Sequence, residues 1–260
     1  MGEHVQLERD TAPGVATIRL DRPKVNAITV AMTEDLHAIC TELAADEGVR
    51  SVVFTGGERH FAAGMDIGDF ERLDRAGAHD LATKLNAAAL ALENLPQITI
   101  SAINGFALGG GLELAMATDF RIAAGDARMG QPEMLLGVMP GGGGSQRLPR
   151  LTGITLAKEL IYTGRNLTAE EALAAGVISS IHEPDEVQAA AVELATRYAA
   201  GPASLRLAKT VMVAGMHLSV EDAVQLEIEA FADAFETDDR TIGVASFLEN
   251  GPGKAEFTGR

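Results

Sequence analysis

The sequence predicts an α/β fold followed by a helical tail, and two observations lead to this prediction. Up to about Gly176, segments with strand-like patterning alternate with segments of helical periodicity, and no long polar linker divides them. Beyond that point only helical periodicity continues, and Gly201 and Pro202 interrupt it. We therefore expect a core over residues 1–200 and a helical region over residues 201–260.

The first part of the chain predicts a β-β-α-β order. Residues 5–10 and 15–21 show the alternation of a half-buried strand and are joined by a turn over residues 11–14, which together predict a hairpin. The later elements are expected in this order: a helix from Thr33 to about Glu47, a strand at 51–55, a helix at roughly 73–95, and strands at 98–103 and 119–124. Helices at 186–199, 204–214 and 220–235 then form the tail, where Val224, Ile228 and Phe231 share an apolar face.

Composition narrows the class of protein. The chain of 260 residues is long enough to bury a large core without disulfides or metals. Its formal net charge of -16 disfavours binding to nucleic acid or to an anionic membrane, so an anionic ligand would need a local basic patch and backbone amides. We expect a cytoplasmic protein, because no apolar run is long enough to cross a bilayer and the first residues lack the pattern of a signal peptide.

The single cysteine, Cys40, excludes an intrachain disulfide. It lies at helical spacing with Leu36, Ile39 and Leu43, which predicts a buried core thiol and not a nucleophile.

The stretch from Gly105 to Pro140 carries the chemistry. Three consecutive glycines, Gly109–Gly111, precede a short apolar helix, and they leave its first backbone N–H groups open to a ligand. Glu113 lies in that helix and Glu133 lies in a second apolar segment, so each carboxylate is either paired or used in acid/base chemistry. The paired alternative has three candidate partners: Arg121, Arg128 and Arg147.

Three motifs in order resemble the crotonase superfamily, and specifically its enoyl-CoA hydratases. They are HFAAGMDIGDF at residues 60–70, GFALGGGLELAMATD at 105–119 and GQPEMLLGVMPGGGGSQRL at 130–148. Taken alone, the first motif is equally well explained as a close-packed turn between a strand and a helix. The resemblance implies a crotonase-like spiral of ββα turns, a C-terminal helical region that makes trimer contacts, and trimers that commonly pair into hexamers.

The resemblance also implies an oxyanion hole. It assigns the backbone N–H groups of Met65 and Gly110 to the thioester oxygen, on which enolate charge develops when water adds to the double bond. The family usually has Ala in place of Met65 and Lys in place of Gly68, so the acyl pocket and one ligand-facing charge are expected to differ here.

The same resemblance assigns roles to the two glutamates. Glu113 becomes the base that takes a proton from water, and Glu133 becomes the donor to C2 of the substrate, so the two titrate as a coupled pair. Gly141 matches the position whose backbone N–H helps to hold the water.

The CoA and acyl contacts are carried over from matching positions. The loop at residues 21–27 corresponds to the loop beside the CoA nucleotide, although it is one residue shorter than the common form. Arg59 is either a contact to a CoA phosphate or a solvated surface arginine. The full set of expected substrate contacts is Lys24, Val25, Ala27, Arg59, Ala63, Asp66, Ile67 and Gly68, with Phe70 and Leu73 also beside the acyl pocket.

Other chemistries lack their motifs. Neither glycine run completes GxGxxG, and no Lys follows the run at 141–144 as a phosphate-binding P-loop requires. The six histidines show no metal-ligand spacing, so we expect no metal and no cofactor apart from the CoA of the substrate.

The sequence therefore predicts a hydro-lyase that adds water to trans-2-enoyl-CoA and assembles as a homotrimer or a dimer of trimers. Other reactions of the same fold, double-bond isomerisation or acyl-CoA hydrolysis, are the first alternative. A non-catalytic homologue that binds acyl-CoA or RNA is the second, although both glutamates are present and no lysine-rich helix is found.

Overall fold

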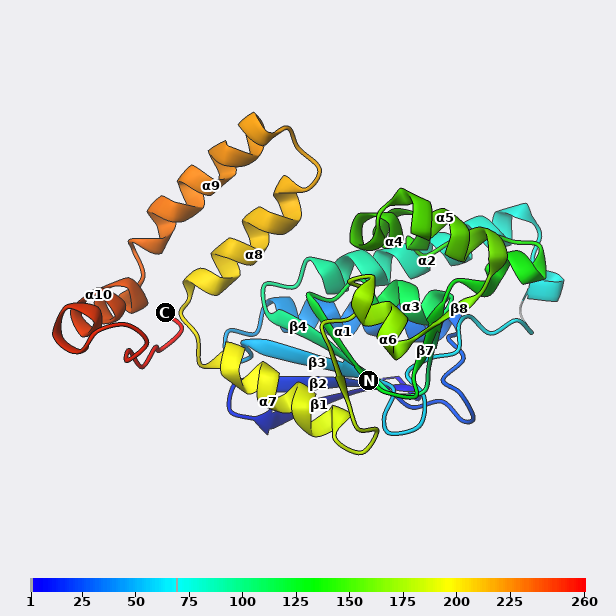
Figure 1. Ribbon diagram of the computed structural model, residues 1–260, viewed down its shortest axis with the longest axis horizontal. Coiled ribbons are helices and arrows are strands. Elements are labelled where there is room, and N and C mark those ends of the chain that lie inside the picture. Colours follow the sequence, from blue (N-terminus) through cyan, green and yellow to red (C-terminus); the bar gives the residue numbers. More distant parts are fainter. Residues whose placement is uncertain (1, 69) are drawn as a thin grey trace.

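The computed structural model describes residues 2–68 and 70–260, and two sheets organise that part of the chain (Figure 1). The larger sheet has the strand order β1-β2-β3-β4-β6-β9, and its neighbours are parallel except for the antiparallel β1 and β2. Its strands are β1 (Val5–Ala12), β2 (Val15–Leu20), β3 (Ser51–Thr55), β4 (Ile98–Ile103), β6 (Phe120–Ala124) and β9 (Ser180–His182). The smaller sheet has the order β5-β7-β8, with strands β5 (Phe106–Leu108), β7 (Arg128–Gly130) and β8 (Asn166–Thr168).

Helices fill most of the connections between these strands. The helical elements of the core are α1 (Val30–Ala44), η1 (Phe70–Arg72), α2 (Arg75–Glu93), α3 (Gly110–Ala115), η2 (Pro132–Leu136), α4 (Gly144–Thr152), α5 (Ile154–Thr163), α6 (Ala169–Ala174) and α7 (Val187–Ala199). Helix α1 begins three residues before the predicted start, because Thr29 caps it by accepting a hydrogen bond from Met32 N–H. Asp74 caps α2 in the same way, by accepting from Gly77 N–H at 2.9 Å.

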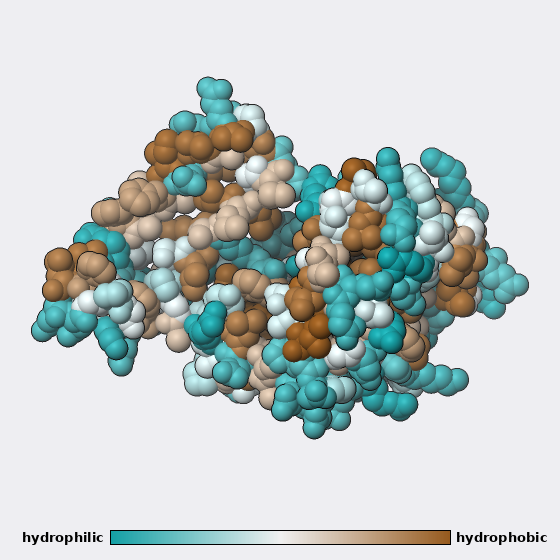
Figure 2. All heavy atoms as spheres, in the orientation of Figure 1, coloured by the Kyte–Doolittle hydropathy of each residue, from teal (hydrophilic) through white to brown (hydrophobic). Residues whose placement is uncertain are grey.

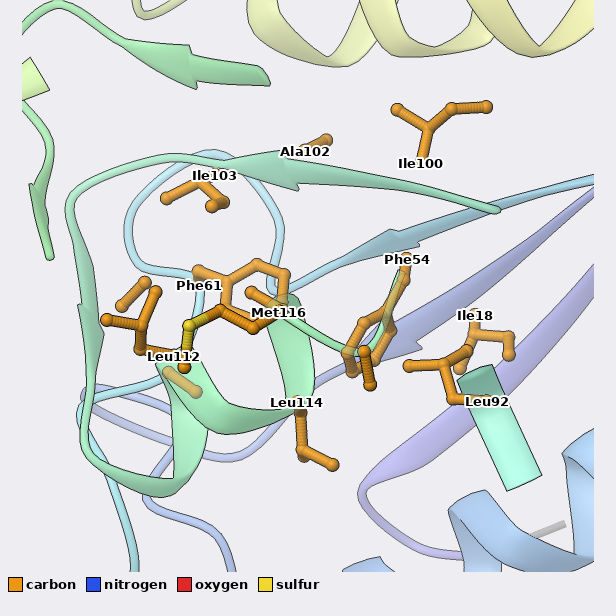
Figure 3. Close-up of a cluster of buried hydrophobic side chains, with 14 of the residues drawn as sticks. Ile18, Phe54, Phe61, Leu92, Ile100, Ala102, Ile103, Leu112, Leu114 and Met116 are labelled. Carbon is orange, nitrogen blue, oxygen red and sulfur yellow. The ribbon is translucent and has the colours of Figure 1, made fainter. Parts of the chain in front are cut away.

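The core lies on both faces of the larger sheet. Every residue of β3 and β4 is buried, as expected for central parallel strands covered on both sides. Figure 3 shows Phe54, Leu114 and Leu92 together on one side of the sheet, while Ile100 points to the other side. Every residue of the short helix α3 is buried in this core, so packing fixes the position of its first turn.

The tail consists of α8 (Ser204–Gly215), α9 (Val220–Ala234) and α10 (Asp238–Asn250), which extend away from the sheets (Figure 1). The sequence patterns predicted the first two of these helices and missed α10. Large apolar side chains are exposed along α9, among them Val224, Ile228 and Phe231. Figure 2 shows apolar surface over this region. Within the described residues, no helix is both long and apolar enough to span a membrane.

Candidate active site

A cavity of about 880 Å³ lies where α2, the start of α3, η2 and the segment after β3 meet. Both glutamates singled out by the sequence line it, together with Met65, Gly110 and Gly141. Its remaining wall is mostly apolar and includes Ile67, Phe70, Leu73, Leu81, Leu85 and Leu136. The cavity therefore combines two carboxylates with a surface suited to a hydrocarbon chain.

Glu113 lies in the first turn of α3, and backbone donors from the loop at residues 141–144 hold its carboxylate. Its side chain is only 1% exposed, and its Oε1 accepts hydrogen bonds from Gly142 N–H at 2.8 Å and from Gly144 N–H at 2.7 Å. Burial raises the pKa of Glu113, while these two hydrogen bonds and the charge of Arg147 act in the opposite direction. One oxygen is thus anchored, which leaves Oε2 as the atom that can act on a ligand.

Two glycines of the loop at residues 141–144 are required by this contact. A Cβ on Gly142 would lie 2.5 Å from Glu113 Oε2, and a Cβ on Gly144 would lie 2.9 Å from Glu113 Oε1 and 2.2 Å from Gln131 Oε1. Only a residue without a side chain lets both N–H groups approach the carboxylate so closely.

Glu133 has a different environment. It follows Pro132 at the start of η2, and both of its carboxylate oxygens are buried without a hydrogen-bond partner among the described residues. Burial, followed by the nearby charge of Glu113, raises the pKa of Glu133 to about 7. A carboxyl group of this kind is partly protonated near neutral pH and is suited to proton transfer.

The paired alternative for the two glutamates does not hold in the described part of the chain. Arg121 donates to the carbonyl oxygens of Val177 and Thr118, and Arg128 donates to those of Asp126 and Ala127. Arg147 forms its ion pair with Glu93 at 2.6 Å. No ion pair within the described residues includes Glu113 or Glu133, so both carboxylates are available to a ligand in the cavity.

The backbone N–H groups of Met65 and Gly110 lie at the cavity and make no hydrogen bond within the described residues. Met65 forms an isolated parallel bridge with Ile28, whose bonds use the flanking residues, since Ile28 N–H donates to Gly64 and Asp66 N–H donates to Ile28. This leaves Met65 N–H unused. Gly110 is the first residue of α3, where N–H groups have no partner within the helix.

The Met65 side chain also fills space at this point. Its Sδ lies 3.1 Å from the position that a Cβ on Gly110 would take, so the thioether packs directly over that glycine. Met65 is larger than the Ala that the family usually has at this position, and its side chain therefore narrows the cavity beside the two N–H groups.

Gly141 lies on the cavity wall and is exposed. Its carbonyl oxygen accepts a hydrogen bond from Asn86 Nδ2 at 2.6 Å. No hydrogen bond from its N–H is recorded among the described residues, so that group is open to a ligand.

The loop at residues 21–27 packs against the segment that carries Met65. Val25 accepts a hydrogen bond from Ala63 N–H at 3.0 Å, and Ala27 accepts one from Arg22 Nη1 at 3.0 Å. Lys24 is exposed, with a positive φ of 79°. These residues do not line the cavity, and the hydrogen bond to Val25 supports the segment around Ala63.

The other expected contacts divide into two groups. Ala63 and Ile67 line the cavity, whereas Arg59 and Gly68 are exposed and lie outside its lining. The carboxylate of Asp66 is already engaged within the protein, because it accepts from Gly68 N–H at 3.1 Å and pairs with Arg22 at 2.6 Å, and both interactions lower its pKa. Asp69, which belongs to the same sequence motif, lies outside the described residues.

Sequence reasoning passed over Asn26, which holds this region together. Its side-chain amide donates to the carbonyl oxygens of Gly56 and His60, at 2.8 and 3.0 Å, and its Oδ1 accepts from Arg22 N–H at 2.8 Å. Asn26 has a φ of 52°, a conformation that asparagine adopts more readily than most residues. An asparagine directly after a proline-containing turn was the available signal.

Comparison with known proteins decides the family. The family model described as enoyl-CoA hydratase/isomerase matches residues 10–260. The chain belongs to the enoyl-CoA hydratase/isomerase family. Within this family it is 38% identical over 238 residues to the short-chain-enoyl-CoA hydratase of Clostridium acetobutylicum, covering 90% of this chain and 91% of that protein. It is 36% identical over 250 residues to the crotonyl-CoA hydratase of Syntrophomonas wolfei, covering 95% of each chain.

A solved member of the family has the same fold. The enoyl-CoA hydratase from Bacillus anthracis superposes with a TM-score of 0.93 at 34% sequence identity, covering 99% of this chain and 100% of that one. This match confirms the crotonase fold that the sequence motifs implied.

Proposed function

We propose that the protein is an enoyl-CoA hydratase, a hydro-lyase that adds water reversibly to trans-2-enoyl-CoA and yields 3-hydroxyacyl-CoA. The observation that carries this proposal is the presence of two carboxylates with different environments, Glu113 and Glu133, on one largely apolar cavity. Hydration needs a proton to be removed from water and another to be delivered to carbon, so two groups in opposite protonation states suit it.

The proposed reaction begins with the thioester oxygen between Met65 N–H and Gly110 N–H. These donors stabilise the negative charge that develops on this oxygen as water adds to C3. Glu113 acts as the base through Oε2, because its Oε1 is held by two N–H groups that favour the ionised form. Glu133 delivers its proton to C2, and its raised pKa supports that role. Gly141 N–H holds the attacking water.

Two features favour hydration over double-bond isomerisation or thioester hydrolysis. An isomerase can work with a single carboxylate, whereas this cavity presents two. The relatives named above are also named as hydratases. Acyl-CoA is therefore the proposed substrate class, and fatty-acid β-oxidation or a related acyl-CoA breakdown is the proposed context.

The test is turnover of enoyl-CoA thioesters of increasing chain length, followed by the loss of ultraviolet absorbance of the conjugated double bond. Crotonyl-CoA is the first substrate to test, because one relative is named for it. Formation of the 3-hydroxy product identifies hydration, a shifted double bond identifies isomerisation, and free CoA identifies hydrolysis. Absence of the 3-hydroxy product from every chain length would contradict the proposal.

We also propose that the protein assembles as a trimer or a dimer of trimers through its C-terminal helices. Large apolar side chains are exposed on α8 and α9, and a monomer would leave them in water. Light scattering tests this, because a monomer has a mass of 27.2 kDa. A mass near that value at micromolar concentration would exclude the assembly. The cytoplasmic location stays a prediction, which cell fractionation tests.

A further inference from the structure

Glu113 is positioned by a loop that has no side chains of its own. Residues 141–144 are all glycine, and two of their N–H groups hold Glu113 Oε1. Glycine backbone has more conformational freedom than any other, so this loop needs contacts from outside to keep its N–H groups aimed at the carboxylate.

Two side chains supply such contacts by binding the loop's carbonyl oxygens. Arg147 Nη1 donates to the oxygen of Gly142 at 3.2 Å, and Asn86 Nδ2 donates to the oxygen of Gly141 at 2.6 Å. Because the peptide unit is planar, Asn86 also fixes the N–H of Gly142, which binds Glu113. Arg147 fixes the next peptide along the chain, which lies between the two N–H groups that donate to Glu113.

Arg147 is itself held by Glu93, near the end of α2. The guanidinium makes two hydrogen bonds to this carboxylate, from Nη2 at 2.6 Å and from Nε at 3.3 Å. The Arg147 side chain is only 11% exposed, so the pair is largely shielded from solvent. Asn86 and Glu93 both belong to α2, seven residues apart, and therefore lie on the same face of that helix.

We propose that Arg147, held by Glu93, is a positioning residue for the proposed base Glu113: it fixes the glycine loop that binds one carboxylate oxygen and supplies a nearby positive charge. This inference rests on the proposed hydratase function. Arg147 acts through the loop and touches neither the substrate nor the reacting atoms.

The charges around Glu113 determine what a substitution does to its titration. Arg147 on α4 lowers the pKa of Glu113, against the effect of burial. Glu133 on η2 is electrostatically coupled to Glu113, and Glu93 on α2 lies behind Arg147. Removal of the Arg147 charge therefore makes Glu113 harder to ionise, whereas removal of the Glu93 charge does not.

The experiment compares Arg147→Gln with Arg150→Gln, a matched control. Arg150 lies on the same helix, is exposed, and donates only to the carbonyl oxygen of Gln146 among the described residues. With crotonyl-CoA as substrate, Arg147→Gln is expected to lower kcat by roughly a hundredfold, the size of effect that a misplaced catalytic group produces, with KM changed less than about threefold. The acid limb in the pH profile of kcat/KM of Arg147→Gln moves to higher pH, because Glu113 is then harder to ionise. The control keeps wild-type kinetics.

Two further variants separate orientation from charge. Arg147→Lys keeps the positive charge, so the acid limb of its pH profile stays at the wild-type pH. It loses the bidentate hydrogen bonding to Glu93, so its kcat falls. Glu93→Gln also lowers kcat, because Arg147 loses its ion-pair partner, but its acid limb does not move to higher pH than that of the wild type.

The outcomes are distinguishable. A wild-type protein that hydrates no enoyl-CoA defeats the proposed function itself. An active wild type with unchanged kcat and pH profile in folded Arg147→Gln overturns the positioning role, and so does an equal loss in Arg150→Gln. If Arg147→Gln does not fold by circular dichroism, Glu93→Gln decides: full kcat there overturns the inference, and a reduced kcat with retained KM supports it.

Discussion

Replacing Glu133 by glutamine should stabilise the fold while it removes activity, and the gain should grow with pH. Burial raises the pKa of Glu133 from 4.5 to about 7 in the folded protein. Between these two pH values the unfolded chain has released a proton that the folded protein still binds, so the contribution of Glu133 to stability falls as pH rises. Glutamine does not titrate, and Glu133→Gln removes this loss.

The size of the effect follows from the shift. Each pKa unit corresponds to about 1.4 kcal/mol, so a shift of about 2.5 units costs roughly 3 kcal/mol once the pH is well above 7. At pH 5 most of that cost has not yet appeared. The free energy of unfolding of Glu133→Gln relative to wild type should therefore rise by about 2.5 kcal/mol between pH 5 and pH 8.

Denaturant unfolding at pH 5 and pH 8 measures this difference, at one fixed protein concentration because assembly would add to stability. Comparison between two pH values cancels any constant cost of burying the amide. Glu47→Gln is the control, because Glu47 is exposed at a turn and the substitution relieves no burial. If the difference between Glu133→Gln and wild type is the same at both pH values, the raised pKa of Glu133 is wrong.

Three further predictions test the site and the core. Glu113→Gln should stay folded and lower hydration of crotonyl-CoA by at least about a hundredfold, as the loss of a proton-transfer group does; full activity would contradict the role of base. Gly110→Pro deletes one of the two proposed donors and should cost roughly 3 kcal/mol of transition-state stabilisation, whereas Met65→Ala keeps its N–H and should remain active; both are compared after circular dichroism and CoA affinity match wild type. Cys40 is buried with its pKa raised to about 12, so a thiol reagent should label it only in denaturant, and rapid labelling of the native protein would refute this burial.

The sequence predicted the central strands to the residue and the helix ends less well. The strands at Ser51–Thr55 and Ile98–Ile103 are short apolar runs bounded by polar or turn-forming residues, so their limits are visible in the pattern. The start of α1 depends on Thr29, whose role as a cap becomes clear only from its hydrogen bond to Met32 N–H. Helix α10 was missed because its apolar residues are few and scattered among polar ones.

The candidate site divides in the same way. Motifs identified Glu113, Glu133 and the glycine runs before and after them because these features are close together in the sequence. The support behind them joins distant positions: Arg147 and Glu93 are 54 residues apart, and Asn86 and Gly141 are 55 apart. A charged or amide residue on a helix gives no local sign of which distant loop it holds, so these partners needed the structure.

The attachment of the tail to the core bears on the proposed assembly. Lys209 is the buried residue of α8 in the described structure, and its Nζ donates to Asp119 Oδ2 and to the carbonyl oxygen of Gln97, both at 2.7 Å. Asp119 also accepts from Thr99 N–H and Oγ1. A buried ion pair contributes little net stability, because desolvation offsets most of the attraction, but it specifies one orientation. The pair thus joins α8 to the core, while the exposed apolar faces of α8 and α9 supply the hydrophobic area that another subunit would bury.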